Sequence, residues 1–214
     1  MSRKFSVLAA LAGASLLAAG SAQAATYTLA DLVSGGGTTS FTSDDGTLTF
    51  SDFAVTKTKK LSSDLSLYTI TTTADGYVLT SGEFDAASGG LRRLDLSYKV
   101  TGTSAIVQAS LDIAGSRTTG KAKVEKDIDD PASDEGTFLL AYLQSSGSSL
   151  SDSDTFSPGA LSFEVDEQIR LKKVSSITSI TDSYQVVPEP TTLSLISAGL
   201  AGLAWIGRRR TIRA

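Results

Sequence analysis

LDLSYKVTGTSAIVQASLDI, residues 94–113, is the stretch that decides the fold class. Apolar and polar side chains alternate from residue 94 to 100, and the alternation resumes at residues 107–113 after Thr101-Gly102-Thr103. A period of two places every second side chain on the same face of a strand. This pattern predicts an antiparallel hairpin with one buried face, one hydrated face and a turn at residues 101–103.

The same half-buried alternation recurs along most of the chain. It predicts further strands at residues 47–55, 67–73, 77–80, 121–128, 137–143, 161–171 and 174–184. Segments rich in Asp, Gly and Ser between them have the composition of turns. We therefore expect an all-β fold, an antiparallel β-sandwich of immunoglobulin-like or jelly-roll topology. A closed barrel and a β-solenoid are the alternatives, although no fixed-period repeat supports a solenoid.

In each predicted strand, the alternate positions that carry apolar side chains are expected to point inward and form the core. Four phenylalanines fall on it and are expected to be buried: Phe50, Phe53, Phe138 and Phe163. Glu167 interrupts the apolar phase of the strand at residues 161–171. Either a β-bulge or a site would explain that interruption.

Cysteine and histidine are both absent from the 214 residues. Their absence excludes disulfide bonds, thiolate or imidazole metal ligands, and every mechanism that pairs a nucleophile with histidine. Glycoside hydrolysis could still use two carboxylates, but the sequence shows no carboxylate in an apolar, aromatic-rich setting that would raise its pKa. We therefore expect no enzymatic activity and no cofactor.

The middle of the chain is acidic. Residues 25–187 carry 13 Lys and Arg against 22 Asp and Glu, a net charge of −9, which disfavours nucleic acid and anionic lipid as partners. Five carboxylates gather in one stretch: Asp127, Asp129, Asp130, Asp134 and Glu135. They could supply part of a Ca²⁺ site, but their spacing does not match an EF-hand. We interpret the stretch as a solvated loop, with a weak surface calcium site as the alternative.

The first 24 residues have the organisation of a secretory signal peptide. Arg3 and Lys4 precede an apolar run at residues 5–19, and small residues follow at Ala22 and Ala24. A signal peptidase reads small residues at these two positions, which predicts cleavage before Ala25. We expect an N-terminal signal helix, export, and a mature chain that begins at Ala25.

Three features follow one another near the C-terminus. The strand pattern ends at Pro188-Glu189-Pro190, residues 191–207 are uncharged, and three arginines come next: Arg208, Arg209 and Arg210. The uncharged stretch predicts a transmembrane helix slightly short for a bilayer. Positive charge directly after it places the tail inside the cell and residues 25–187 outside.

This tail resembles the PEP-CTERM sorting signal of bacteria, also known as an ice-binding protein C-terminal segment. The Pro-Glu-Pro tripeptide, the apolar stretch and the arginine cluster carry the resemblance. It implies recognition by a membrane-embedded exosortase that cleaves at or near the motif, in cells that make exopolysaccharide. A plain C-terminal membrane anchor is the alternative.

Together these features predict three parts: a signal peptide at residues 1–24, an extracellular β-sandwich domain at 25–187, and a sorting tail at 188–214 with its transmembrane helix at 191–207. We expect an exported bacterial surface or extracellular-matrix protein whose precursor is anchored in the inner membrane. Its expected role is structural or adhesive within an exopolysaccharide layer. A carbohydrate- or calcium-binding extracellular module is the alternative.

Overall fold

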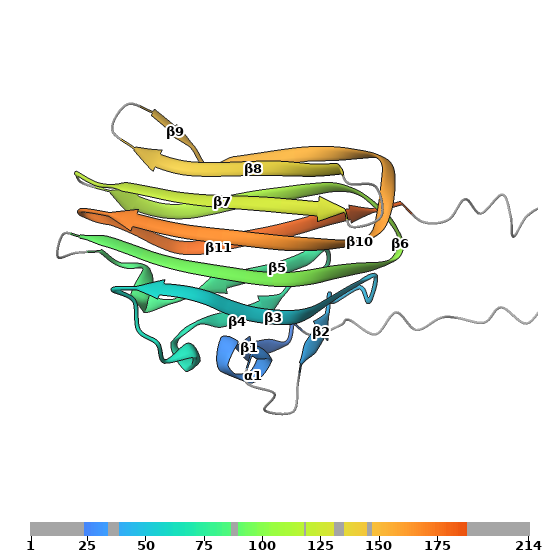
Figure 1. Cartoon of the computed structure of the whole chain (residues 1–214), viewed down its shortest axis with the longest axis horizontal. Helices are drawn as coiled ribbons and strands as arrows, with labels where there is room; N and C mark the ends of the chain where they lie inside the picture. The colour runs from blue at the N-terminus through green and yellow to red at the C-terminus, as the bar shows by residue number, and fades with distance from the viewer. Residues whose placement is uncertain are drawn as a thin grey trace, which may run out of the picture.

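The structure of the protein, a computed structural model, describes residues 24–33, 39–86, 90–117, 119–130, 135–144 and 147–187. These residues are mostly β-strand, which confirms the expectation of an all-β fold (Figure 1). Their helical elements are α1 (Leu29–Val33) and two 3-10 helices at Leu65–Leu67 and Gly82–Phe84. The strands are β1 (Thr26–Thr28), β2 (Ser40–Thr42), β3 (Leu48–Lys59), β4 (Thr69–Thr72), β5 (Gly76–Thr80), β6 (Leu91–Arg117), β7 (Lys121–Asp130), β8 (Glu135–Gln144), β9 (Gly147–Ser149), β10 (Ser151–Lys172) and β11 (Ser175–Val186).

The strands form one antiparallel sheet that folds back on itself. Its main path runs β1-β4-β5-β11-β6-β10-β7-β8-β9, and β3 pairs with both β2 and β6. The first half of β6 pairs with β3 and with the second half of β10, whereas residues 106–117 of β6 pair with β11. Two layers therefore face each other, one with β3, β7 and β8 and the other with β4, β5 and β11 (Figure 1).

The hairpin predicted at residues 94–113 is wrong, because this stretch lies within the single long strand β6. Tight hairpin turns need a positive φ, and the glycines with positive φ among the described residues are Gly46 and Gly90, not Gly102. The Thr103 N–H instead donates to the carbonyl of Thr47 at 2.8 Å. On one side of β6, β3 pairs with its first half and β11 with its second half, while β10 pairs with both halves on the other side. The chain therefore passes from one layer to the other rather than turning back.

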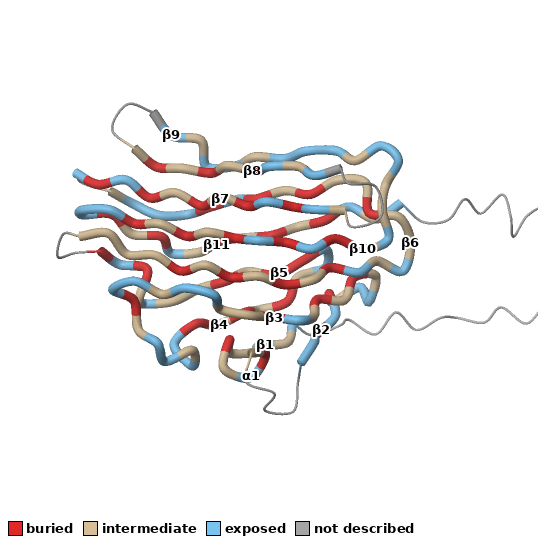
Figure 2. Tube along the Cα trace, viewed as in Figure 1, coloured by how far each residue is buried: buried red, intermediate tan, exposed pale blue. Residues whose placement is uncertain are grey.

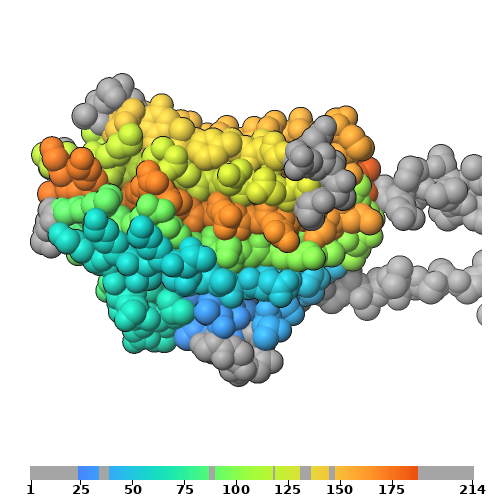
Figure 3. Space-filling view, viewed as in Figure 1, coloured from blue at the N-terminus to red at the C-terminus, as the bar shows by residue number. Residues whose placement is uncertain are grey.

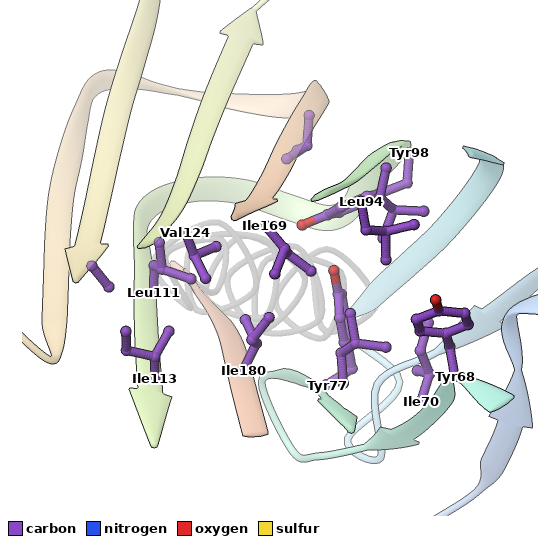
Figure 4. Close-up of a cluster of buried hydrophobic side chains, with 14 of the residues drawn as sticks. Tyr68, Ile70, Tyr77, Leu94, Tyr98, Leu111, Ile113, Val124, Ile169 and Ile180 are labelled. Atoms are coloured by element: carbon purple, nitrogen blue, oxygen red, sulfur yellow. The ribbon is translucent and has the colours of Figure 1, made fainter. Parts of the chain in front are cut away.

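The core lies between the two layers. Buried positions alternate with exposed or half-buried ones along β7, β11 and residues 163–172 of β10 (Figure 2). Phe50, 0% exposed, meets Tyr77 edge to face with ring centroids 5.3 Å apart. Figure 4 shows Tyr77 and Tyr98 entering this core from β5 and β6 with their hydroxyl oxygens directed inward. Such aromatic contacts add to the stabilisation that burial alone provides.

Phe50, Phe53 and Phe163 are buried as expected, but Phe138 is 52% exposed. In β8 the buried positions are Leu139, Ala141 and Leu143, so Phe138 lies on the opposite phase. The local sequence is apolar on both phases, and a shift of one residue exchanges the two faces of a strand. Phe138 lies on the outer face of the layer formed by β8, β7, β10, β6 and β3, which Figure 3 shows from outside.

Candidate functional site

The predicted sorting residues lie beyond the described part of the chain. Strand β11 ends at Val186, and the Val187 N–H donates to the carbonyl of Ala105 at 2.9 Å. Pro188, Glu189 and Pro190, the span at residues 191–207 and the arginine cluster Arg208, Arg209 and Arg210 follow outside the described residues. Within the described ranges, no helix has the length and apolar character needed to cross a membrane. The transmembrane helix stays a prediction.

The predicted cleavage site lies next to the first strand. Ala22 is outside the described residues, whereas Ala25 is held on the edge of β4. Its N–H donates to Thr72 Oγ1 at 2.8 Å, and its carbonyl accepts from the Thr72 N–H at 2.9 Å. Cleavage between Ala24 and Ala25 stays a prediction.

The calcium candidates fall on β7, on β8 and between them. Asp127 and Asp129 lie on exposed positions of β7, and burial together with Asp129 and Asp166 raises the pKa of Asp127. Asp130 closes β7, Asp134 is outside the described residues, and Glu135 begins β8. In the part of the chain that the structure describes, no three carboxylates gather closely enough to hold a metal ion. The interpretation as a loop is wrong for Asp127, Asp129 and Asp130, which belong to β7. A weak surface calcium site stays the untested alternative.

Three charged side chains lie in the centre of the core. They are Lys126 on β7, Glu167 on β10 and Asp182 on β11, at 0%, 1% and 0% exposure. Each occupies an inward position of its strand: in β7, for example, Lys126 follows Ala122 and Val124 on the buried face. Lys126 and Glu167 are direct neighbours in the β7–β10 register, and Asp182 comes from the opposite layer.

These side chains contact one another across the two layers. Lys126 Nζ donates to Asp182 Oδ1 in a fully buried ion pair. The Tyr77 hydroxyl donates to Glu167 Oε2 at 3.4 Å. Within the described residues, Glu167 Oε1 and Asp182 Oδ2 have no hydrogen-bond partner. A buried polar atom without a hydrogen-bond partner lowers the stability of the fold. The hydrogen bonds within this cluster therefore do not fully compensate for its burial.

Aromatic rings enclose the amine. Lys126 Nζ lies 5.4 Å from the centroid of the Tyr184 ring and 6.0 Å from that of Tyr98. The hydroxyls of these two tyrosines share a hydrogen bond at 3.1 Å. The rings exclude water and provide only weak compensation for the charge of an ammonium group.

Burial has the largest effect on the titration of these groups. It lowers the pKa of Lys126 to about 8, against the opposing effect of the Glu167 charge. It raises the pKa of Glu167, against the lowering effects of Lys126 and of the Tyr77 hydroxyl. Burial also raises the pKa of Tyr77 and Tyr98 well above the usual phenol value. Burial therefore shifts Lys126 and Glu167 toward their neutral forms.

Sequence reasoning missed this cluster. Glu167 is not at a bulge, because β10 stays in register with β6 and β7 through residues 162–172. It is also a carboxylate in an apolar, aromatic setting, which the sequence was expected to lack. The sequence did contain one indication of the cluster, because three predicted strands each have a charged residue at a position where the alternation calls for an apolar one. These residues are Lys126, Glu167 and Asp182. Each alone resembles an ordinary interruption, and only the fold brings them together.

Comparison with known families identifies the tail. Residues 186–210 match the PEP-CTERM protein-sorting motif. The chain carries a PEP-CTERM protein-sorting motif. The resemblance inferred from the tripeptide, the apolar stretch and the arginine cluster is confirmed. A PEP-CTERM motif implies an exported protein whose membrane-anchored precursor is processed by an exosortase. The match begins at the last residue of β11, so the PEP-CTERM motif directly follows the folded body.

The folded body resembles three solved structures at a distance. A search of curated proteins gives no match. Among solved structures, TmCBM61 in complex with β-1,4-galactotriose matches with a TM-score of 0.35 and 6% identity over 65% of this chain and 88% of that one. TmCBM27, a carbohydrate-binding module that recognises mannan, matches with a TM-score of 0.32 and 6% identity over 62% and 85%. Tailspike protein 4 of bacteriophage CBA120 matches with a TM-score of 0.31 and 11% identity over 67% and 20%. Likenesses this distant carry no conclusion about the present chain.

Proposed function

We propose that this chain is an exported bacterial surface or extracellular-matrix protein with a structural or adhesive role in an exopolysaccharide layer. The observation that carries the proposal is the PEP-CTERM motif at residues 186–210, directly after the last strand. The signal peptide at residues 1–24 directs export, and the helix at residues 191–207 holds the precursor in the inner membrane. An exosortase then processes the tail, and the body remains at the cell surface or in the matrix.

The folded body suits a structural role. Its two facing layers support a β-sandwich, in which the shared strands β6 and β10 tie the layers into one continuous sheet. The acidic surface, with a net charge of −9 over residues 25–187, keeps the body soluble outside the cell. The same charge disfavours nucleic acid and anionic lipid surfaces as partners of the body.

The proposed role is not that of an enzyme. Glu167, whose pKa burial raises, is 1% exposed, so an external substrate cannot reach its carboxyl group. Asp127, whose pKa is also raised, lies on the exposed face of β7 in an open groove, where solvent weakens the effect of its neighbours. General acid catalysis needs a carboxyl group that is both perturbed and accessible to the substrate.

The sorting claim is tested by changing the tail in a host that carries an exosortase. The full chain is compared with a chain that lacks residues 188–214, with Glu189→Ala, and with a matched control that lacks only residues 211–214. We expect the full chain and the control to yield the same shortened product at the cell surface. Deletion of residues 188–214 and Glu189→Ala should change the size or the cell fraction of the product. Products identical in size and fraction for all four chains would contradict the proposal.

Carbohydrate binding is the second candidate function, and one observation favours it. A groove of about 510 Å³ on the outer face is lined by Phe138, Asp127, Asp166 and Arg170, among others. An exposed ring can stack on a sugar while carboxylates and a guanidinium accept and donate hydrogen bonds to its hydroxyls. Calorimetric titration with the producer's polysaccharide tests this: Phe138→Ala should abolish binding, whereas the exposed control Leu161→Ala should not. No heat from the unmodified protein contradicts this second candidate.

A further inference from the structure

The ion pair between Lys126 and Asp182 is unusual in its place and its surroundings. Both side chains are fully buried, and they come from β7 and β11 in opposite layers of the fold. A buried ion pair is a poor source of stability, because desolvation of the two charges offsets their attraction. Here the pair also leaves Asp182 Oδ2 and the neighbouring Glu167 Oε1 without hydrogen-bond partners in the described part of the chain.

We propose that the Lys126 side-chain amine and the Asp182 carboxyl group condense into an intramolecular amide bond, with Glu167 transferring the protons. The reactants are already in place, since Lys126 Nζ contacts Asp182 Oδ1 and Glu167 is its neighbour on the adjacent strand. The bond would join the two layers of the sheet covalently. It would provide a cross-link in a chain that has no cysteine.

The step balances without any external reagent. The Lys126 ammonium first gives a proton to the Asp182 carboxylate, which leaves a neutral amine and a neutral acid in contact. The nitrogen lone pair then forms a C–N bond to the side-chain carbonyl carbon of Asp182. Glu167 gives its proton to the departing hydroxyl and then accepts one from the nitrogen. The C–O bond breaks with its electron pair on oxygen, one water leaves, and Glu167 ends as it began. No atom is oxidised or reduced.

The surroundings favour each part of this step. Burial lowers the pKa of Lys126 to about 8, so the nucleophilic free amine is accessible near neutral pH. Burial raises the pKa of Glu167, which keeps a proton available for transfer. Glu167 Oε1 has no partner within the described residues, so it is available to exchange a proton, while the Tyr77 hydroxyl orients the other oxygen.

The fold also supplies the driving force. Holding two reacting groups in contact gives effective concentrations on the order of 10⁵ M or more. The aromatic enclosure by Tyr98 and Tyr184 excludes the water that would reverse the reaction. Conversion of an ammonium and a carboxylate into a neutral amide removes both buried charges and their desolvation cost. Covalent closure is therefore favoured once the protein has folded.

Peptide mapping of the purified full chain tests the proposal directly. Trypsin cannot cleave after a lysine whose amine is in an amide, so residues 124–170 should remain uncut at Lys126. The digest should contain this peptide joined to the peptide that begins at residue 174. The joined species should be about 18 Da, one water, lighter than the sum of its parts. Cleavage after Lys126, with separate peptides from residues 124–126 and from residue 174 onward, would overturn the proposal.

Variants test the role of Glu167. Glu167→Gln has the shape and charge of the protonated acid but cannot transfer a proton, so joining should slow by at least about 100-fold. The matched control Asp166→Asn changes the adjacent, outward-facing carboxylate and should join at the unmodified rate. Far-ultraviolet circular dichroism checks that both variants fold. A folded Glu167→Gln variant that joins at the unmodified rate would overturn the assignment of Glu167.

Discussion

Loss of the proposed cross-link should be visible as a loss of stability in Glu167→Gln. Lys126 and Asp182 are 56 positions apart in the sequence, so a covalent bond between them closes a long loop in the unfolded chain. For a loop of this length, the lost entropy of the unfolded state corresponds to about 4 kcal/mol of stability. In a domain of this size that loss lowers the midpoint of thermal unfolding by about 10 °C. The substitution itself is close to isosteric, so most of the change should come from the missing bond.

Guanidinium titration followed by far-ultraviolet circular dichroism is the appropriate assay, because the single tryptophan, Trp205, lies in the tail. The unmodified chain, Glu167→Gln and the Asp166→Asn control are compared. Glu167→Gln should unfold at a lower denaturant concentration and with a larger m-value, since an unlinked chain exposes more surface when it unfolds. The control should match the unmodified chain to within about 1 kcal/mol, because the repulsion between Asp166 and Asp127 that it relieves is weakened by solvent. Equal midpoints for the unmodified chain and for a Glu167→Gln sample that peptide mapping shows to be unjoined would refute the reasoning.

Two other predictions follow from the packing and the charges. A Cβ added at Gly76 would collide with the backbone carbonyl of Asp182, so Gly76→Ala should lower the free energy of unfolding by about 1–3 kcal/mol, measured by thermal unfolding. The control Gly82→Ala has open space around its added Cβ and should leave the midpoint of unfolding unchanged. Equal effects of the two would contradict the close approach of β5 and β11. Burial and neighbouring carboxylates raise the pKa of Asp127, so the stability contributed by the protonated group is lost as the pH rises through that pKa. Asp127→Asn should therefore stabilise the protein at neutral pH, by less than about 1 kcal/mol because the side chain is exposed. Below the ordinary carboxyl pKa the substitution should have no effect on stability. The same stabilisation at neutral and at low pH would contradict this prediction.

Alternation of apolar and polar residues was sufficient to predict most strands. β7, β11 and the second half of β10 appear where the period of two placed them, because burial of one face is a local property of the sequence. The first half of β10, from Ser151, was not predicted as a strand. The hairpin at residues 94–113 failed for a non-local reason. Whether a strand turns back or continues depends on the partners available on either side. β10 pairs with both halves of β6, whereas β3 pairs with the first half and β11 with the second.

The buried cluster could not be predicted for a related reason. Lys126, Glu167 and Asp182 are far apart in the chain, and each interrupts a separate apolar pattern. Their chemistry arises only from the register of β7 with β10 and from the packing of β11 on the opposite layer. The sorting tail was the reverse case, because its tripeptide, apolar stretch and arginines are contiguous in the sequence and match a known motif.

Mass spectrometry of the mature protein recovered from outside the producing cells tests the central claim most directly. The account predicts a species that begins at Ala25, ends at or near residues 188–190 and is present only when an exosortase is active. A recovered species that still contains residues 191–214 in cells with an active exosortase would contradict it.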